Sequence, residues 1–263
     1  MKFKNLFKSI MLIVILALAS ISCGVSDLPF LATETPTPTA TYTPSPTSTP
    51  TQTPTSTPTN TPSPTTLPTG VTSEEQVDGS TLFVDYDNKY QMILPVDWVI
   101  IPFEKETIAN ALDVLADENP HLASSAEAFK ELDPNVIRMI ALNTDLKYLV
   151  GGSSSNITVA VIDDAILSAL PLSFVTDVLE ESFTQQGINV LTSEVNIIEN
   201  DHGVEVEYID IEQRANNEKV LQRIIVFKTS DNLMLVTITT LQQFEDEIFP
   251  ISDQIGVSIE IFE

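Results

Sequence analysis

The sequence predicts an α+β domain over residues 80–263, an αβα sandwich in which an antiparallel sheet of about six to eight strands has helices on both faces. Four strand-like segments in its second half are separated only by short, turn-forming breaks, so neighbouring strands must run antiparallel. Residues 221–227 and 233–238 are apolar at nearly every position, which is typical of strands covered on both faces. Segments with apolar residues at helical spacing lie between the strands and after the last one.

The domain is expected to open with a hairpin. Leu82, Val84 and Tyr86 alternate along residues 81–86, and residues 90–94 form a second strand after the turn signal at 87–89. The segment 95–98 then breaks the strand pattern.

Helices and strands then alternate. Residues 136–143 and 156–162 are predicted strands around a looser stretch at 151–155, and a helix is expected from Pro171 to Gln186, with Gly187 at its end. Phe174, Val178 and Phe183 lie near one face of that helix. Before these strands, two helical stripes flank Asn119-Pro120 and end at Asp133-Pro134: Ile108, Ala111, Leu112 and Leu115, then Leu122, Ala126, Phe129 and Leu132.

The last third predicts a meander of strands at 188–198, 204–211, 219–228 and 233–240. The breaks between them are rich in Asn, Asp and Gly, the residues that favour turns. A final helix contains Phe244, Ile248 and Ile255, and residues 257–262 are a candidate strand at the sheet edge.

One short motif and the order of the elements over about 180 residues carry a resemblance. The motif is Tyr90-Gln91-Met92-Ile93-Leu94-Pro95-Val96-Asp97-Trp98. Together they resemble the PsbP/Mog1-like fold, whose families often start with an aromatic residue, an apolar strand, Pro and then Gly-Trp; here Asp97 replaces the glycine. The resemblance implies an αβα sandwich with an accessory or binding role, and it transfers no catalytic or cofactor residues.

Residues 1–22 are typical of a secretory signal peptide. Lys2, Lys4 and Lys8 precede an apolar run over residues 10–21, which is shorter than the roughly 20 residues that a membrane-spanning helix needs. Cys23 follows at once, in Ser20-Ile21-Ser22-Cys23-Gly24, a pattern that resembles a bacterial lipobox although Ser20 stands where Leu is usual. We therefore expect Cys23 to be lipidated, palmitate included, and to anchor an extracytoplasmic lipoprotein; the alternative is a soluble secreted protein.

Residues 23–79 are predicted to be a disordered linker. From Thr33 to Thr69 it is almost entirely Thr, Pro and Ser, with too little apolar surface to fold. Extended polyproline conformations would give a spacer of about 100 Å at full stretch. Its hydroxyls are candidate acceptors for O-linked sugars, and a ligand for proline-reading domains is the alternative reading.

The mature chain is strongly acidic. Nine of the 12 basic residues and all 37 acidic residues follow the leader, which leaves a net charge of −28. This charge repels phosphate backbones, so the sequence predicts no nucleic acid binding. Solubility is the simplest reason for the charge, and attraction of cations or a basic partner is the other.

The sequence offers no catalytic motif, cofactor site or metal site. Cys23 is the only cysteine, and Gly-x-Ser-x-Gly is absent. His121 at a helix start and His202 in a turn are expected to be surface or capping residues. Gly151-Gly152-Ser153 lacks the lysine of a phosphate-binding loop.

The acidic pairs are expected to be structural. Asp85-Tyr86-Asp87-Asn88 begins like a calcium loop but continues with Lys89 and Tyr90. Asp163-Asp164 ends a strand, Glu245-Asp246-Glu247 opens a helix, and Trp98 is expected in the core.

The sequence thus predicts a non-enzymatic accessory or binding protein with an unidentified protein or envelope partner. The alternative is an envelope hydrolase with unidentified acidic catalytic residues, and weak calcium binding is a third hypothesis.

Overall fold

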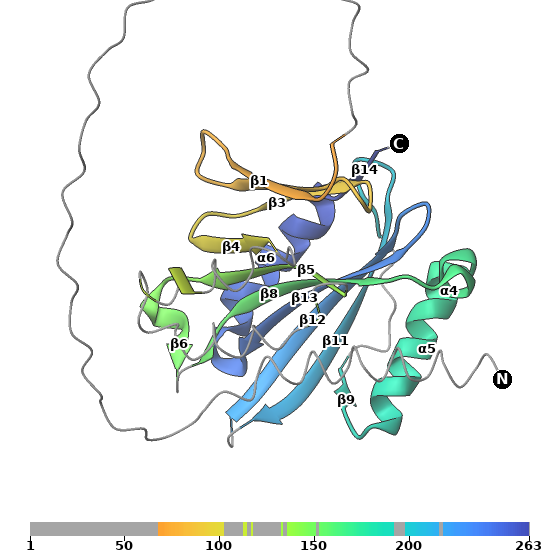
Figure 1. Cartoon of the computed structure of the whole chain (residues 1–263). Helices are drawn as coiled ribbons and strands as arrows, with labels where there is room; N and C mark the ends of the chain where they lie inside the picture. Colours follow the sequence, from red (N-terminus) through yellow and green to blue (C-terminus); the bar gives the residue numbers. More distant parts are fainter. Residues whose placement is uncertain are drawn as a thin grey trace, which may run out of the picture. The chain divides into compact units, whose positions relative to one another are not determined.

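The computed structural model describes residues 68–102, 113–114, 117, 133, 136–150, 153–191, 198–215 and 218–262. Two antiparallel sheets make up most of this part (Figure 1). The main sheet has the strand order β10-β11-β12-β13-β8-β5-β4, and β9 pairs with β11. Its strands are β4 (Trp98–Pro102), β5 (Ile137–Asn143), β8 (Asn156–Ile162), β9 (Asn189–Val190), β10 (Ile198–Glu199), β11 (Glu205–Ala215), β12 (Glu218–Lys228) and β13 (Leu233–Leu241).

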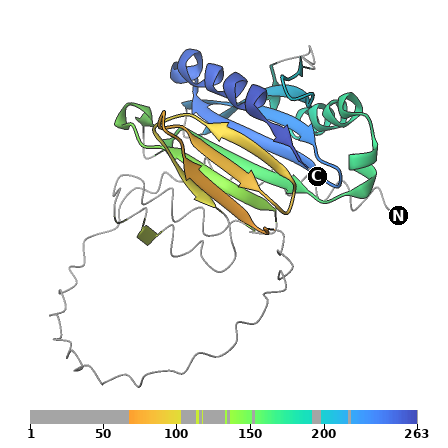
Figure 2. The same ribbon diagram turned by 90° about the horizontal axis from the view of Figure 1, so that it is seen from above.

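The small sheet has the order β1-β2-β3-β14. It lies over one face of the main sheet, as Figure 2 shows. Its strands are β1 (Val71–Glu75), β2 (Thr81–Asp85), β3 (Tyr90–Leu94) and β14 (Glu260–Ile261). A short hairpin of β6 (Leu149–Val150) and β7 (Ser153–Ser154) stands apart, next to the 3-10 turn η2 (Leu146–Tyr148).

The main sheet is covered on both faces, as its apolar strands predict. One face packs against α4 (Ala165–Ala169) and α5 (Leu172–Gln185). The other face packs against the small sheet and α6 (Glu245–Ser258), which follows the 3-10 turn η3 (Gln242–Phe244). The predicted α+β class, with helices on both faces of an antiparallel sheet, is confirmed.

Two strands lie where none was predicted, and two predicted helices cannot be compared with the structure. β1 falls within residues 23–79, which were expected to be linker, and it pairs with β2 along its whole length. Its only buried residue is Val71, so it has no alternation that would reveal a strand. β4, directly after the break at 95–97, was also not predicted. The helical stripes at 108–132 lie almost wholly outside the described residues.

The buried face of α5 differs from the predicted one. Phe174 is 50 % exposed, although it was expected near the buried face. The helix instead buries a stripe at spacings of three and four residues, displaced from Phe174, and this stripe faces β11 and β12. It consists of Leu172, Val175, Thr176, Leu179, Ser182 and Phe183.

A buried ion pair joins the two sheets. Asp85, at the end of β2, is 0 % exposed and accepts hydrogen bonds from Arg138 Nε at 2.9 Å and Nη2 at 3.0 Å. Arg138 lies at a β-bulge in β5, so its side chain and that of Met139 both point to the small sheet. Asn88 donates two further hydrogen bonds to Asp85 at 3.1 and 2.8 Å.

A second polar cluster holds α6 on the main sheet. Arg223 donates to both carboxylate oxygens of Asp210 at 2.8 Å and to Asp253 Oδ1 at 3.1 Å. Asn200 donates to the carbonyls of Gly256 and Ile259 at 3.0 and 2.7 Å, which satisfies the C-terminal end of the helix.

We expect Arg138→Ala to lower the free energy of unfolding by about 3–5 kcal/mol, because it leaves Asp85 charged, buried and without its main partner. Asp87→Asn is the matched control, since Arg138 also donates to Asp87 at 2.7 Å and that side chain is 45 % exposed. It should cost less than about 1 kcal/mol. Urea unfolding of both variants makes the comparison, and equal losses would contradict this account of the pair.

Candidate functional site

The small sheet exposes one face to solvent, and we call it the outer face. Side chains alternate along each strand, so Phe83 and Met92 point into the core while their neighbours point outward. The outward set mixes apolar side chains with polar and acidic ones. Its members are Thr72, Glu74, Leu82, Val84, Tyr86, Gln91, Ile93, Glu260 and Phe262.

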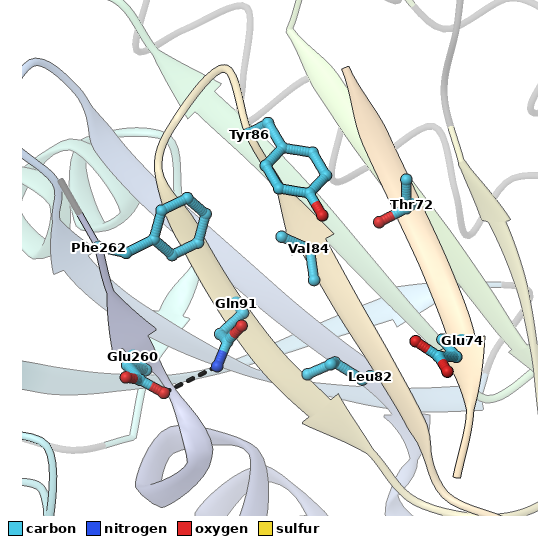
Figure 3. Close-up of a pocket in the computed structure, with 8 residues that line it drawn as sticks. All are labelled: Thr72, Glu74, Leu82, Val84, Tyr86, Gln91, Glu260 and Phe262. Carbon is cyan, nitrogen blue, oxygen red and sulfur yellow. Dashed lines mark hydrogen bonds between the residues drawn. The ribbon is translucent and has the colours of Figure 1, made fainter. Parts of the chain in front are cut away.

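A shallow hollow of about 340 Å³ lies on the outer face. Leu82 and Val84 form its floor, and the rings of Tyr86 and Phe262 stand beside them, with centroids 6.1 Å apart in an edge-on arrangement (Figure 3). Glu74 and Glu260 lie on opposite sides of the floor. The hollow therefore combines apolar area with negative charge.

One polar contact fixes the β14 side of this hollow. Gln91 Nε2 donates to Glu260 Oε2 at 2.7 Å, joining β3 to β14 (Figure 3). The backbone of Phe262 donates to the carbonyl of Lys89 at 3.0 Å, which holds its ring beside Tyr86.

A second hollow of about 380 Å³ continues beyond the end of β3. Ile93, Pro95 and Val96 supply its apolar wall, and Ile93 is 44 % exposed. On the α6 side, the Ser258 hydroxyl accepts from the Ile93 backbone N–H at 2.9 Å. These partly exposed apolar residues extend the candidate contact surface toward α6.

The chemistry of the outer face suits recognition. Its acidic side chains lie at the rim, and its centre offers aliphatic and aromatic surface. Such a surface is complementary to a group that carries apolar atoms together with positive charge.

Most of the predicted structural carboxylates have structural contacts. Asp85 and Asp87, at the calcium-like sequence, both bind Arg138. Asp164 accepts from the backbone N–H groups of Ile166 and Leu167 and caps α4. Glu247, in the first turn of α6, pairs with Lys147 and accepts from the Tyr148 hydroxyl at 2.8 Å.

The remaining predicted residues are scattered. Cys23, His121 and Gly151-Gly152 lie outside the described residues. His202 lies in the turn before β11 with its side chain 42 % exposed, 3.9 Å from Glu260. Trp98 is buried beneath the small sheet, as predicted.

Asp97 shows why its position suits glycine. Its φ is +69°, in the left-handed region that Gly adopts freely and Asp tolerates better than most residues. A glycine would adopt this backbone conformation without strain.

Sequence reasoning missed Glu207. This β11 side chain is 0 % exposed and points to α5, where its Oε2 contacts the Thr176 hydroxyl and its Oε1 has no partner among the described residues. Burial raises the pKa of Glu207, and nearby Glu205, Asp177 and Glu180 add to the shift. In the sequence, a buried position in a strand is recognised by an apolar residue, so an acidic residue at position 207 gives no sign of burial.

Comparisons with known proteins add three structural likenesses. No family profile and no curated protein matches the chain. The cyanobacterial PsbP (CyanoP) of Synechocystis sp. PCC 6803 aligns with a TM-score of 0.40 and 10 % identity over 77 % of this chain and 98 % of that one. LpqN, involved in cell envelope biogenesis of Mycobacterium tuberculosis, aligns with a TM-score of 0.41 and 9 % identity over 73 % and 91 %.

The third likeness is to a protein of unknown function from Pseudomonas aeruginosa, with a TM-score of 0.35 and 15 % identity over 40 % of this chain and 72 % of that one. All three TM-scores are below 0.5, so the functional argument depends on the chain's own surface.

The described residues hold neither a membrane-spanning helix nor a metal cluster. No helix among them is long and apolar enough to cross a membrane. No group of three or more His, Cys, Asp or Glu residues among them is arranged to hold a metal ion.

We expect Glu207→Gln to stabilise the fold at neutral pH by about 1 kcal/mol, because the amide removes a buried charge and can donate to Thr176. In the native protein, the raised pKa of Glu207 means that its contribution is fully present below the unfolded value of about 4.3 and is lost as pH rises through the folded pKa. The difference between variant and native protein in urea unfolding should therefore grow as the pH rises from about 4. Glu205→Gln, on the same strand, is the control; an equal gain there would show that only net charge matters.

Proposed function

We propose that this protein is a lipid-anchored extracytoplasmic lipoprotein that displays a non-enzymatic binding domain, and that the outer face of the small sheet is its binding surface. The observation that carries the proposal is the hollow between the acidic rims, where Leu82, Tyr86 and Phe262 are partly exposed over the buried Val84. An accessory role of this kind agrees with the family resemblance of the hairpin motif.

Two features favour binding over hydrolysis. Hydrolysis of a glycosidic bond by carboxylates needs two acids that reach the substrate from a common cleft. Glu207 has a raised pKa, yet it is fully buried against α5. The rim acids Glu74 and Glu260 stand on opposite sides of an open hollow, with Gln91 bound to Glu260.

The anchor gives this surface a place to act. The leader and Cys23 lead us to place the domain outside the cytoplasmic membrane, on its outer surface or in the envelope. Buried acyl chains contribute about 0.8 kcal/mol per methylene, so a chain with more than one acyl group would remain at the membrane. The Thr/Pro linker would then hold the binding surface away from the lipid.

Cys23→Ala should release the protein into the medium, because the thiol that carries the lipid is absent. Fractionation of cells producing the native and variant chains, with mass spectrometry of the mature N-terminus, measures this. Ser22→Ala, which keeps the thiol and a small residue before it, should remain membrane-bound. An unmodified thiol in the native protein, or equal membrane retention of Cys23→Ala, would refute the anchor.

A photo-cross-linking residue at Ile93 tests the binding surface in intact cells. Because Ile93 is 44 % exposed on the outer face, we expect it to give a discrete adduct with a partner upon illumination. Ile166, on α4 and 51 % exposed, is the matched control and should give none. No adduct at Ile93, or the same adducts at both positions, would refute the outer face as the binding surface.

A further inference from the structure

One edge of the small sheet has unused backbone hydrogen-bonding groups. Two backbone hydrogen bonds flank β1: the Gly70 carbonyl accepts from Tyr86 N–H at 2.9 Å, and Gln76 N–H donates to the Ser80 carbonyl at 2.7 Å. The backbone N–H and C=O groups of the even-numbered residues between them therefore point to β2. Antiparallel pairing alternates, so the N–H and C=O groups of Val71, Ser73 and Glu75 point away from β2. These groups have no backbone partner among the described residues.

This edge is open to solvent. Thr72, Ser73, Glu74 and Glu75 are all exposed, although successive side chains lie on opposite faces of the sheet. After Val71, which is buried in the core, the side chains of β1 are therefore exposed on both faces of the sheet. β4 of the main sheet lies nearby, but it pairs with β5 and takes none of the β1 groups (Figure 1).

Proteins commonly protect such an edge with charged side chains, especially Lys, or with Pro or a bulge. β1 has no Lys, Pro or bulge, and its ladder with β2 is regular from Val71 to Glu75, so its protection is confined to the negative charges of Glu74 and Glu75, which repel acidic strands and not basic ones. An exposed regular edge is the feature that partners use when they add a strand to a sheet.

The charges along this edge select the partner. Glu74 and Glu75 place one carboxylate on each face of β1, and Asp78 follows in the turn to β2. Glu74 also lies at the rim of the hollow of the outer face. A strand beside β1 would set its alternating side chains next to these acids on one face or the other.

We propose that the β1 edge takes up an extended, Lys- or Arg-bearing segment of a partner protein as an added strand. This inference rests on the proposed function of the outer face and names the mode of binding and the chemistry of the partner. Main-chain hydrogen bonds to residues 71, 73 and 75 supply the register, and the acids supply selectivity. A second copy of this chain is disfavoured, because two such edges would bring their carboxylates together.

The test uses the full chain purified in detergent and an eight-residue peptide of alternating Lys and Val with blocked ends. Ser73→Pro removes an outward N–H without removing a bond to β2, since proline is tolerated in edge strands when its nitrogen faces solvent. It should weaken binding of the peptide about tenfold, the loss expected for one hydrogen bond. Ser73→Ala, which keeps the N–H, should bind as the native chain does.

Two further measurements separate mode from charge. The Lys and Val peptide should slow hydrogen exchange of the Ser73 and Glu75 amides. A peptide of alternating Glu and Val should not bind, and it should leave the exchange of these amides unchanged. Equal binding to Ser73→Pro, or binding without protection of these amides, would overturn the added strand. If neither the native chain nor either Ser73 variant binds the basic peptide, but Ile93 still gives its cross-linked adduct in Ser73→Pro, then the outer face binds a partner and only the added strand is refuted. If Ile93 gives no adduct in the native chain, the proposed function and this inference are both refuted.

Discussion

The pair between Asp85 and Arg138 holds the small sheet over the main sheet. A carboxylate with no exposed surface is tolerated only where charge and hydrogen bonds replace water, and here one guanidinium and the Asn88 amides do so. The bulge in β5 supplies the guanidinium, because it turns Arg138 and Met139 to the same side. Without this arrangement the small sheet would have a buried charge at the end of β2, and the outer face would lose its support.

The support has a direct consequence for the surface above it. With one side of β2 and β3 fixed in the core, the alternation of the strands puts Leu82 and Val84 outward. No helix covers this face: Leu82 stays partly exposed, and Val84 is buried beneath its neighbours in the hollow. Since the main sheet already has cover on both faces, packing alone gives no reason for a third apolar layer, and a binding role does.

The sequence predicted the main architecture because its signals were local. The meander of β11, β12 and β13 follows from short breaks and long apolar runs, and α5 follows from Pro171, Gly187 and helical spacing. The division into two sheets was not predictable in this way, since strand pairing over long sequence separations leaves no local signal. β1 was missed for the same reason: a strand such as Val-Thr-Ser-Glu-Glu is recognisable only by its partner β2.

The candidate site was less predictable than the fold. The acidic residues that stand out in the sequence as candidate ligands or catalysts have structural contacts: Asp87 pairs with Arg138, and Asp164 caps α4. The proposed binding surface instead consists of ordinary residues that become adjacent when β14 (Glu260–Ile261) pairs with β3. Phe262 reaches Tyr86 only through that pairing. A surface of this kind can therefore be recognised only once the pairing of β14 with β3 is known, because its residues are far apart in the sequence.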